Sequence, residues 1–575
     1  MDATSSPRDG RRRMTAPEVL TPGAITPGVI TQGVMTLAML LAATVMPARA
    51  GSGDAAAALP MPALVSHDGR RALLVDGAPF LMLGAQVNNS SNWPAMLPKV
   101  WPAIAALHAN TVEVPISWEQ IEPAEGRFDF SFLDVLLAQA RDHGVHLVLL
   151  WFGTWKNNGP NYAPAWVKLD NKRFPRVIDS HGQVKNSLSP LAASTLDADR
   201  RAFTALMRRL RETDAPRTVI MVQVENETGT YGSVRDYSPM AERAFDSPVP
   251  PELLAALKRG SGGSNWRTAF GQDADEFFHA WSIARYVDAV AAAGKAEYPL
   301  PMYVNAALRD PFKYQDPVTY SSGGPTHNVL DVWKAAAKAI DVIGPDIYSP
   351  SYEFCTAILQ LYDRPDNVLF VPEMGNQPVY ARYLYAVLGR HAIGYSPFGM
   401  DFTGYANYPL GAKSIDEATI EAFAVNYRVL APMARVWAKL AFEGETWGVS
   451  EQDERARQEL DLGRWHAVVE YDRYQFGGDW AKAIRPVGPD GPDGGVLVAR
   501  LGADEFLVIG RNARISFSAA KPSPGHGTIF DRVEEGHYDQ QGRWTFERIW
   551  NGDQTDYGLN FTTLPQVLHV RLAIY

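Results

Sequence analysis

Cysteine is almost absent from this chain of 575 residues, which contains Cys355 alone. A single cysteine excludes an internal disulfide, so the fold must depend on its hydrophobic core. A lone cysteine acts as a nucleophile only beside a positioned histidine, and the sequence indicates no such partner. We therefore expect Cys355 to be a buried structural thiol.

An excess of basic residues is also missing, because 54 Lys and Arg stand against 64 Asp and Glu, for a net charge of −10. The basic residues form no long cluster beyond Arg11–Arg13, so nucleic acid is not expected as a partner. Apolar residues make up 46% of the chain and charged residues 21%, as in globular proteins. The length predicts two or three domains.

No apolar run is long enough to span a bilayer with confidence; the longest candidate is Val34–Met46. Ala48-Arg49-Ala50 follows it and matches the small-x-small pattern of a signal-peptidase site. We interpret residues 1–50 as a signal peptide with an N-terminal extension, and the alternative is a buried apolar segment. The favoured interpretation predicts a periplasmic or secreted protein with no stable membrane insertion after cleavage.

Apolar runs alternate with helix-period segments from about residue 70 to residue 430, which predicts an α/β fold. The runs expected to form strands are Phe80–Leu83, Thr111–Val114, His146–Leu150, Val219–Val224, Pro301–Val304, Val342–Tyr348, Val368–Val371 and Ala392–Tyr395. Eight strands with intervening helices fit a (β/α)8 TIM barrel better than a doubly wound sheet. We assign residues 51–440 to this catalytic domain.

Short alternating runs replace this pattern towards the C-terminus, for example Val496–Leu501, Glu505–Ile509 and Val567–Ile574. Turns rich in Gly, Pro and Asp separate them. Residues 441–575 are therefore predicted to form an all-β, sandwich-like domain.

Two of the predicted strands end in acidic residues. The apolar run Val219–Val222 continues into Gln223-Val-Glu-Asn-Glu227, and the later run ends at Glu373. Strand ends of a barrel converge at its mouth, so Glu227 and Glu373 are expected to face each other across a substrate. Two such carboxyl groups are what a retaining glycosidase needs, one as acid/base and one as nucleophile.

The stretch Gln223–Glu227 closely resembles the corresponding motif of glycoside hydrolase family 35, the β-galactosidases. Further resemblance lies in Asn110-Thr111, in Trp118 through Phe130, and in Pro164-Ala-Trp166. The resemblance covers roughly residues 70–430. The β-rich tail resembles an uncharacterised domain appended to a bacterial branch of that family, which includes enzymes acting on galactose side chains of xyloglucan.

This resemblance implies a role for each of several residues. Glu227 would be the general acid/base and Glu373 the nucleophile. Asn226 would contact the sugar 2-hydroxyl, and Tyr348 would donate a hydrogen bond to the nucleophile. No cofactor is implied, because both chemical steps use only carboxylates.

Other residues are candidates for the walls of the sugar site. Aromatic rings stack on sugars, and core packing is the alternative for each of them. The candidates are Trp118, Trp151, Trp155, Phe398 and, as a polar lining residue or a turn residue, Asn305. No metal site is expected, because His143 and His146 have no carboxylate cluster beside them.

The resulting prediction is a retaining exo-glycosidase whose partner is a carbohydrate with terminal β-galactosides. In typical family members an acid follows the third strand and contacts galactose, whereas Trp151–Asn157 has none. One alternative is therefore the same chemistry on a β-glucoside, β-xyloside, β-glucuronide or arabinoside. Another is a carbohydrate-binding protein without activity.

Overall fold

The computed structural model describes residues 59–259, 264–471 and 491–575. The predicted signal segment, Val34–Met46 with Ala48–Ala50, lies outside these residues. Within the described ranges, no helix has the length and apolar character needed to cross a membrane.

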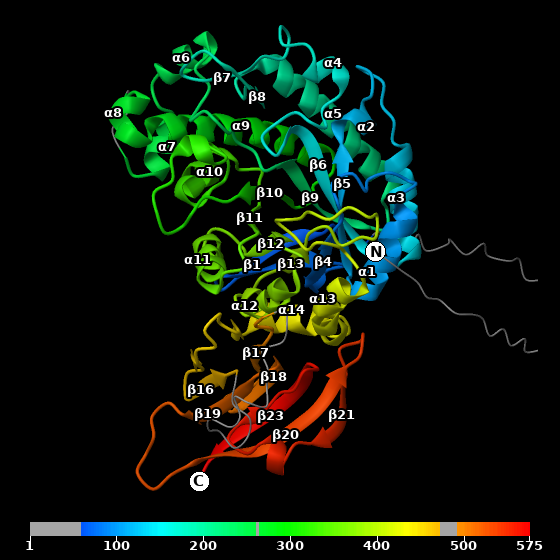
Figure 1. Cartoon of the computed structure of the whole chain (residues 1–575), viewed down its shortest axis with the longest axis vertical. Helices are drawn as coiled ribbons and strands as arrows, with labels where there is room; N and C mark the ends of the chain where they lie inside the picture. The colour runs from blue at the N-terminus through cyan, green and yellow to red at the C-terminus, as the bar shows by residue number, and fades with distance from the viewer. Residues whose placement is uncertain (1–58, 260–263, 472–490) are drawn as a thin grey trace, which may run out of the picture. The chain divides into compact units, whose positions relative to one another are not determined.

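Eight parallel strands close into a barrel in the order β10-β11-β12-β13-β4-β5-β6-β9 (Figure 1). They are β4 (Met82–Gln86), β5 (Thr111–Ser117), β6 (His146–Lys156), β9 (Val219–Asn226), β10 (Met302–Ala307), β11 (Val342–Ile347), β12 (Phe370–Met374) and β13 (Gly394–Pro397). The predicted barrel and its eight strands are confirmed. The first strand begins two residues later than predicted, because Phe80 belongs to the separate strand β3 (Ala78–Phe80).

Helices lie between the barrel strands along the chain and surround them in space (Figure 1). The longer ones are α1 (Leu97–Leu107), α3 (Ser131–Asp142), α5 (Ala193–Thr213), α9 (Ala274–Glu297), α11 (Tyr352–Tyr362), α13 (Glu417–Leu430) and α14 (Ala434–Glu443). Every residue of β9 is buried, as expected for a parallel strand covered on both faces. Cys355, in α11, is buried as predicted.

A small N-terminal sheet, which was not predicted from the sequence, shares a buried cluster with residues of the barrel strands. This sheet has the order β1-β2-β3, with β1 (Ala63–His67) and β2 (Arg70–Val75). Leu73 and Val75 share one buried cluster with Val148 and Phe370 of the barrel strands. The sheet therefore packs against the interior of the barrel.

The loops that follow β6 and β9 carry additional elements. The strands β7 (Arg176–Ile178) and β8 (Val184–Leu188) form a hairpin after β6. Helices α6 (Pro239–Phe245), α7 (Pro251–Ala256) and α8 (Trp266–Phe270) follow β9. Both loops leave the carboxyl ends of their strands, where barrel sites are built.

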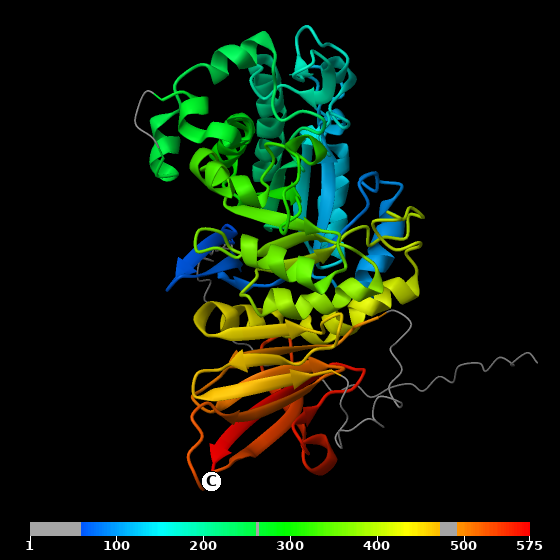
Figure 2. The same cartoon turned by 60° about the vertical axis from the view of Figure 1, so that its left-hand side comes forward.

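Two antiparallel sheets form the C-terminal region (Figure 2). One has the order β14-β17-β18-β23-β20-β21 and the other β15-β16-β19-β22. Their strands are β14 (Thr446–Ser450), β15 (Gln458–Asp461), β16 (Trp465–Glu470), β17 (Gly495–Arg500), β18 (Glu505–Arg511), β19 (Arg514–Ala519), β20 (Thr528–Tyr538), β21 (Trp544–Ile549), β22 (Leu559–Asn560) and β23 (Gln566–Ile574). Both sheets contribute to one core, including Val469, Val498 and Leu568. The predicted all-β region is confirmed, whereas its boundary at residue 440 stays a prediction.

Candidate active site

The two predicted catalytic acids come from strands that are separated by two others in the barrel. Glu227 directly follows β9 and Glu373 lies in β12, with β10 and β11 between them. Asn305 of β10 and Asp346 of β11 lie on these intervening strands. Four neighbouring strand ends thus bring polar side chains to one side of the barrel mouth.

Neutral side chains donate hydrogen bonds to both oxygens of Glu373. Gln86 Nε2 lies 2.9 Å from Oε1, and the Tyr348 hydroxyl lies 2.6 Å from Oε2. The amides of Asn226 and Asn305 lie 3.5 and 3.4 Å from Oε1. This set of donors suits an ionised carboxylate, because none of the amides can take up its proton.

Asn305 links the two acids. Its Oδ1 accepts the backbone N–H of Glu227 at 2.9 Å, while its Nδ2 points at Glu373 and donates to Asp346 Oδ2 at 2.7 Å. The side chain is 1% exposed. An amide fixed at both ends holds the two strand ends in a constant relation, as a carboxylate pair requires.

The pKa of Glu227 is raised by its surroundings. Burial raises the pKa of Glu227 to about 7, and the negative charge of Glu373 acts in the same direction. The ammonium group of Lys156 opposes both effects. A carboxyl group with this pKa holds a proton near neutral pH and can also release it, as a general acid/base must.

A third acid, Asp346, lies beside the pair. Burial and the charges of Glu373 and Glu227 raise its pKa well above the ordinary value. Burial and the charge of Glu373 also raise the pKa of the Tyr348 phenol well above its usual range. Tyr348 therefore keeps its proton and donates it in the hydrogen bond to Glu373.

Lys156, at the end of β6, is a site residue that the sequence did not single out. Its side chain is buried, and Nζ donates to Asn226 Oδ1 at 2.7 Å and to Asn157 Oδ1. Within residues 59–259, 264–471 and 491–575, no carboxylate lies within 4 Å of this ammonium. Because lysine can only donate, it fixes the Asn226 amide with Oδ1 towards Lys156 and Nδ2 towards Glu373.

The backbone of the site has unusual torsion angles. Glu225 and Glu227 have φ values of 65° and 46°, and Asn157 and Asn158 have 53° and 68°. Positive φ is uncommon for glutamate and costs on the order of 1–3 kcal/mol, so it persists where the surrounding structure imposes it. The turn after each of the two adjacent strands β6 and β9 is therefore held in a defined conformation.

The neighbouring acid Glu225 has a different environment. It is fully buried and accepts the backbone N–H of Trp155 at 2.8 Å. Burial and the charge of Asp199 raise its pKa well above the ordinary value. Its contacts are those of a structural residue, and among the described side chains no ion pair reaches it.

The three tryptophans considered for sugar stacking have the contacts of core residues, which was the alternative for each of them. Trp118, Trp151 and Trp155 are at most 1% exposed. Trp118 donates its indole N–H to Glu122, and Trp151 donates to Asp199. The physical reason for Trp151 and Trp155 is that β6 extends to Lys156, which places both in the strand, packed against helices, and not in the following loop.

The remaining candidates lie together. Asn226, Asn305 and Tyr348 contact Glu373, and Phe398 packs its ring edge against Tyr348 with centroids 6.2 Å apart. Gln86, Asp346 and Lys156 were not predicted as site residues. Each is a polar residue at or next to the end of a barrel strand, which is the pattern that identified Glu227.

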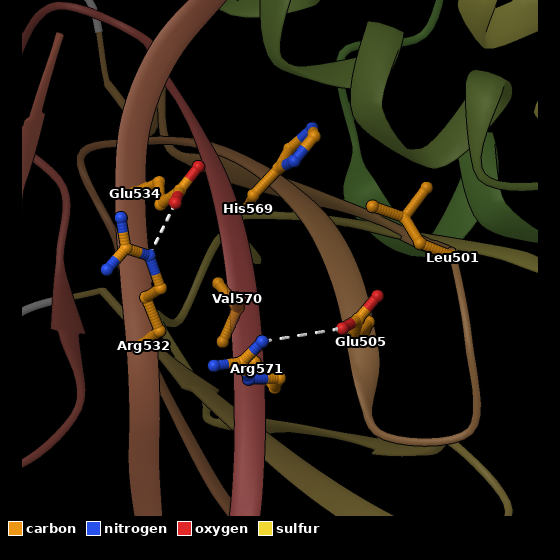
Figure 3. A pocket seen from close by; sticks show the side chains of 7 residues that line it. All are labelled: Leu501, Glu505, Arg532, Glu534, His569, Val570 and Arg571. Atoms are coloured by element: carbon orange, nitrogen blue, oxygen red, sulfur yellow. Dashed lines mark hydrogen bonds and ion pairs between the residues drawn. The ribbon is translucent and has the colours of Figure 1, made fainter. Parts of the chain in front are cut away.

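A hollow on the C-terminal sheet has a different character (Figure 3). Its charged residues pair with one another: Glu534 with Arg532 at 2.5 Å, and Glu505 with Arg571 at 3.9 Å. None of the predicted site residues lines it. We therefore place the candidate active site at the barrel mouth.

Comparisons with known proteins support the class of this site. Residues 95–291 match the glycoside hydrolase 42 family, described as beta-galactosidase, and residues 423–562 match a domain of unknown function, DUF5597. A beta-galactosidase of Xanthomonas manihotis is 30% identical over 179 residues, which cover 29% of this chain and 26% of the relative. Beta-galactosidase Bga of Halorubrum lacusprofundi is 26% identical over 189 residues, covering 30% and 26%. The matched segments span about a quarter of these relatives.

A solved beta-galactosidase from Bacillus circulans sp. alkalophilus is 11% identical, with a TM-score of 0.49, covering 85% of this chain and 99% of that one. The family match supports the predicted glycoside hydrolase class. It comes through family 42, and family 35 is not confirmed. The matched segment includes Glu227 and ends before Glu373.

Proposed function

We propose that this protein is a retaining exo-glycosidase that releases terminal β-galactose from oligo- or polysaccharides. The observation that carries the proposal is the unequal acid pair. Glu373 is held by neutral donors, whereas Glu227, linked to it through Asn305, has a pKa of about 7.

The proposed mechanism is a double displacement. In the first step a Glu373 oxygen attacks the anomeric carbon, the glycosidic C–O bond breaks, and Glu227 gives its proton to the leaving oxygen. In the second step Glu227 takes a proton from water, whose oxygen attacks the anomeric carbon and breaks the bond to Glu373. By the resemblance, the Asn226 amide, oriented by Lys156, would contact the sugar 2-hydroxyl.

The β-galactoside and the xyloglucan side chain are the finer part of the proposal. The beta-galactosidase family match and the two beta-galactosidase relatives support galactose. The stretch Trp151–Asn157 matches the segment where family 35 members carry an acid and contains none, so other β-glycosides belong in the same assay.

The test uses Glu373→Gly with an aryl β-galactoside. We expect turnover to fall by at least about 10⁴-fold, because no covalent intermediate can form, and to return in part with azide. Glu119→Gln, which removes an exposed barrel carboxylate paired with Lys168, is the matched control and should keep wild-type turnover.

Wild-type turnover by Glu373→Gly would exclude Glu373 as the nucleophile. Faster hydrolysis of an aryl β-glucoside, xyloside, glucuronide or arabinoside would keep the mechanism and replace the sugar. Polysaccharide binding without turnover of any glycoside would favour the non-catalytic alternative.

We also propose that the enzyme acts in the periplasm or outside the cell. The support is the apolar run Val34–Met46 followed by Ala48-Arg49-Ala50. N-terminal sequencing of the protein from a fractionated host should give a mature chain starting near Gly51. An intact N-terminus in the cytoplasmic fraction would contradict this.

A further inference from the structure

Large aromatic side chains are exposed on loops that follow four of the barrel strands. The proximal aromatic group comprises Tyr231, after β9, with Phe312 and Tyr314, after β10, and its rings are 49–80% exposed. The distal aromatic group comprises Trp93, after β4, with Tyr405 and Tyr408, after β13, and its rings are 50–60% exposed. Exposed aromatic residues gathered around a site indicate a binding surface.

The barrel order separates these two groups. Strands β9 and β10 are neighbours, and so are β13 and β4. In the closed ring of eight, β13 is the fourth strand from β9, and β4 is the fourth from β10. The two groups therefore leave the barrel on opposite sides of its mouth, and the proximal group follows β9, which Glu227 directly follows, and the neighbouring strand β10.

Hydrogen bonds hold the loops of the proximal group in place. Thr230 and Ser322 exchange backbone bonds of 3.0 and 3.2 Å, and Gly232 N donates to Val318 O at 2.9 Å. Tyr231 thus lies on a segment tied to the neighbouring loop on both sides. A ring on a fixed backbone loses little entropy when it binds a ligand.

Phe312 and Tyr314 have similar support. Asp310 Oδ1 accepts the backbone N–H of Phe312 at 2.9 Å, and Gln315 Oε1 accepts that of Asp310 at 2.9 Å. The Phe312 ring packs edge-on against Phe354, with centroids 6.5 Å apart. The turn that presents the two rings is therefore closed by its own side chains.

The chemistry of the acid pair determines which side receives the leaving group. A general acid must lie beside the oxygen that it protonates, so the departing saccharide lies on the Glu227 side of the released sugar. Tyr231 follows Glu227 by four residues, and after burial the charge of Glu227 is the second cause that raises the pKa of its phenol. Tyr231 is thus next to the leaving-group position, and Phe312 and Tyr314 lie on the loop of the neighbouring strand.

We propose that the proximal aromatic group, Tyr231, Phe312 and Tyr314, is a subsite that stacks on the saccharide from which the terminal sugar is cut. The inference rests on the proposed function and specifies its substrate as a neutral oligosaccharide or polysaccharide chain.

The test compares two triple variants of the full chain. One is Tyr231→Ala with Phe312→Ala and Tyr314→Ala, and the other is Trp93→Ala with Tyr405→Ala and Tyr408→Ala. The substrates are a galactosylated xyloglucan oligosaccharide and β-galactosyl azide, whose leaving group is too small to reach the rings. For the proximal variant we expect kcat/KM on the oligosaccharide to fall about tenfold or more, with hydrolysis of the azide unchanged. The distal variant should keep both.

Calorimetry with the galactose-free oligosaccharide separates this inference from the proposed function. Binding by the wild type that is lost in the proximal variant alone supports the subsite, even if the wild type hydrolyses neither substrate and the proposed function fails. Equal losses on the oligosaccharide and the azide, equal losses in the two variants, or no loss in the proximal variant would overturn the subsite.

Discussion

Acidic side chains lie both at the barrel mouth and in the hollow on the C-terminal sheet, and the two regions differ in whether these acids have an arginine partner. In the hollow, Glu534 and Glu505 each have an arginine partner, Arg532 and Arg571 (Figure 3). At the mouth, no ion pair within 4 Å reaches Glu227, Glu373 or Asp346 in the part of the chain that the structure describes.

This difference separates structural acids from acids available for chemistry. An arginine at contact distance lowers the pKa of Glu534, so that acid stays ionised and inert. Burial beside Glu373 instead raises the pKa of Glu227 to about 7. Two acids kept at the barrel mouth without an arginine partner are costly, which supports a use for this pair, whereas Glu225, equally without an arginine, lies away from the mouth among core contacts.

Glu227→Gln should have the largest effect on kcat/KM. We expect kcat/KM on an unactivated β-galactoside to fall about 10²–10⁴-fold, because the leaving oxygen loses its proton donor. A dinitrophenyl β-galactoside, which needs no proton, should lose far less in the first step. Stopped-flow measurement of both substrates checks this, and equal losses would exclude Glu227 as the general acid.

Lys156→Met tests the electrostatic part of this comparison. It removes the ammonium group that opposes the rise in the pKa of Glu227. Activity needs protonated Glu227, so it is lost as pH rises through the pKa of this group. Without the positive charge that pKa rises, and the alkaline limb of kcat/KM should move up by about one pH unit.

A pH series for kcat/KM measures this shift. Lys168→Met, which removes a partly exposed partner of Glu119, is the control and should leave the limb in place. An alkaline limb that stays in place or moves down in Lys156→Met would contradict the assigned electrostatic role.

Glu534→Gln applies the mildest test, with the same substitution in the other region. The Arg532–Glu534 pair is partly exposed, so the free energy of unfolding should change by less than ~1 kcal/mol, with kcat/KM unchanged. Urea titration and steady-state kinetics check both values. A loss of activity comparable with that of Glu227→Gln would remove the distinction between the two regions.

The barrel strands were predictable because buried parallel strands are continuous apolar runs, as in β9. The acids at the ends of β9 and β12 were predictable for the same reason. The different environments of Glu225 and Glu227 could not be predicted in full. Both residues have positive φ, which the pattern of apolar residues does not reveal, and Glu225 lies beside Trp155 and Asp199.

The other differences from the predicted site arise from the length of the strand β6. The sequence ended the third barrel strand at Leu150, and β6 continues to Lys156. Those six residues decide that Trp151 and Trp155 are core and that Lys156 reaches Asn226. A register shift between β6 and β9 in this stretch has no signature in the pattern of apolar residues.

The measurement that tests the central claim most directly is mechanism-based labelling. The enzyme is treated with dinitrophenyl 2-deoxy-2-fluoro-β-galactoside, digested, and mapped by mass spectrometry. We predict one galactosyl label, on Glu373, and none on Glu227 or Glu534. A label on any other acid, or an enzyme that turns over β-galactosides yet is never labelled, would contradict the assignment of Glu373 as the nucleophile of a double displacement.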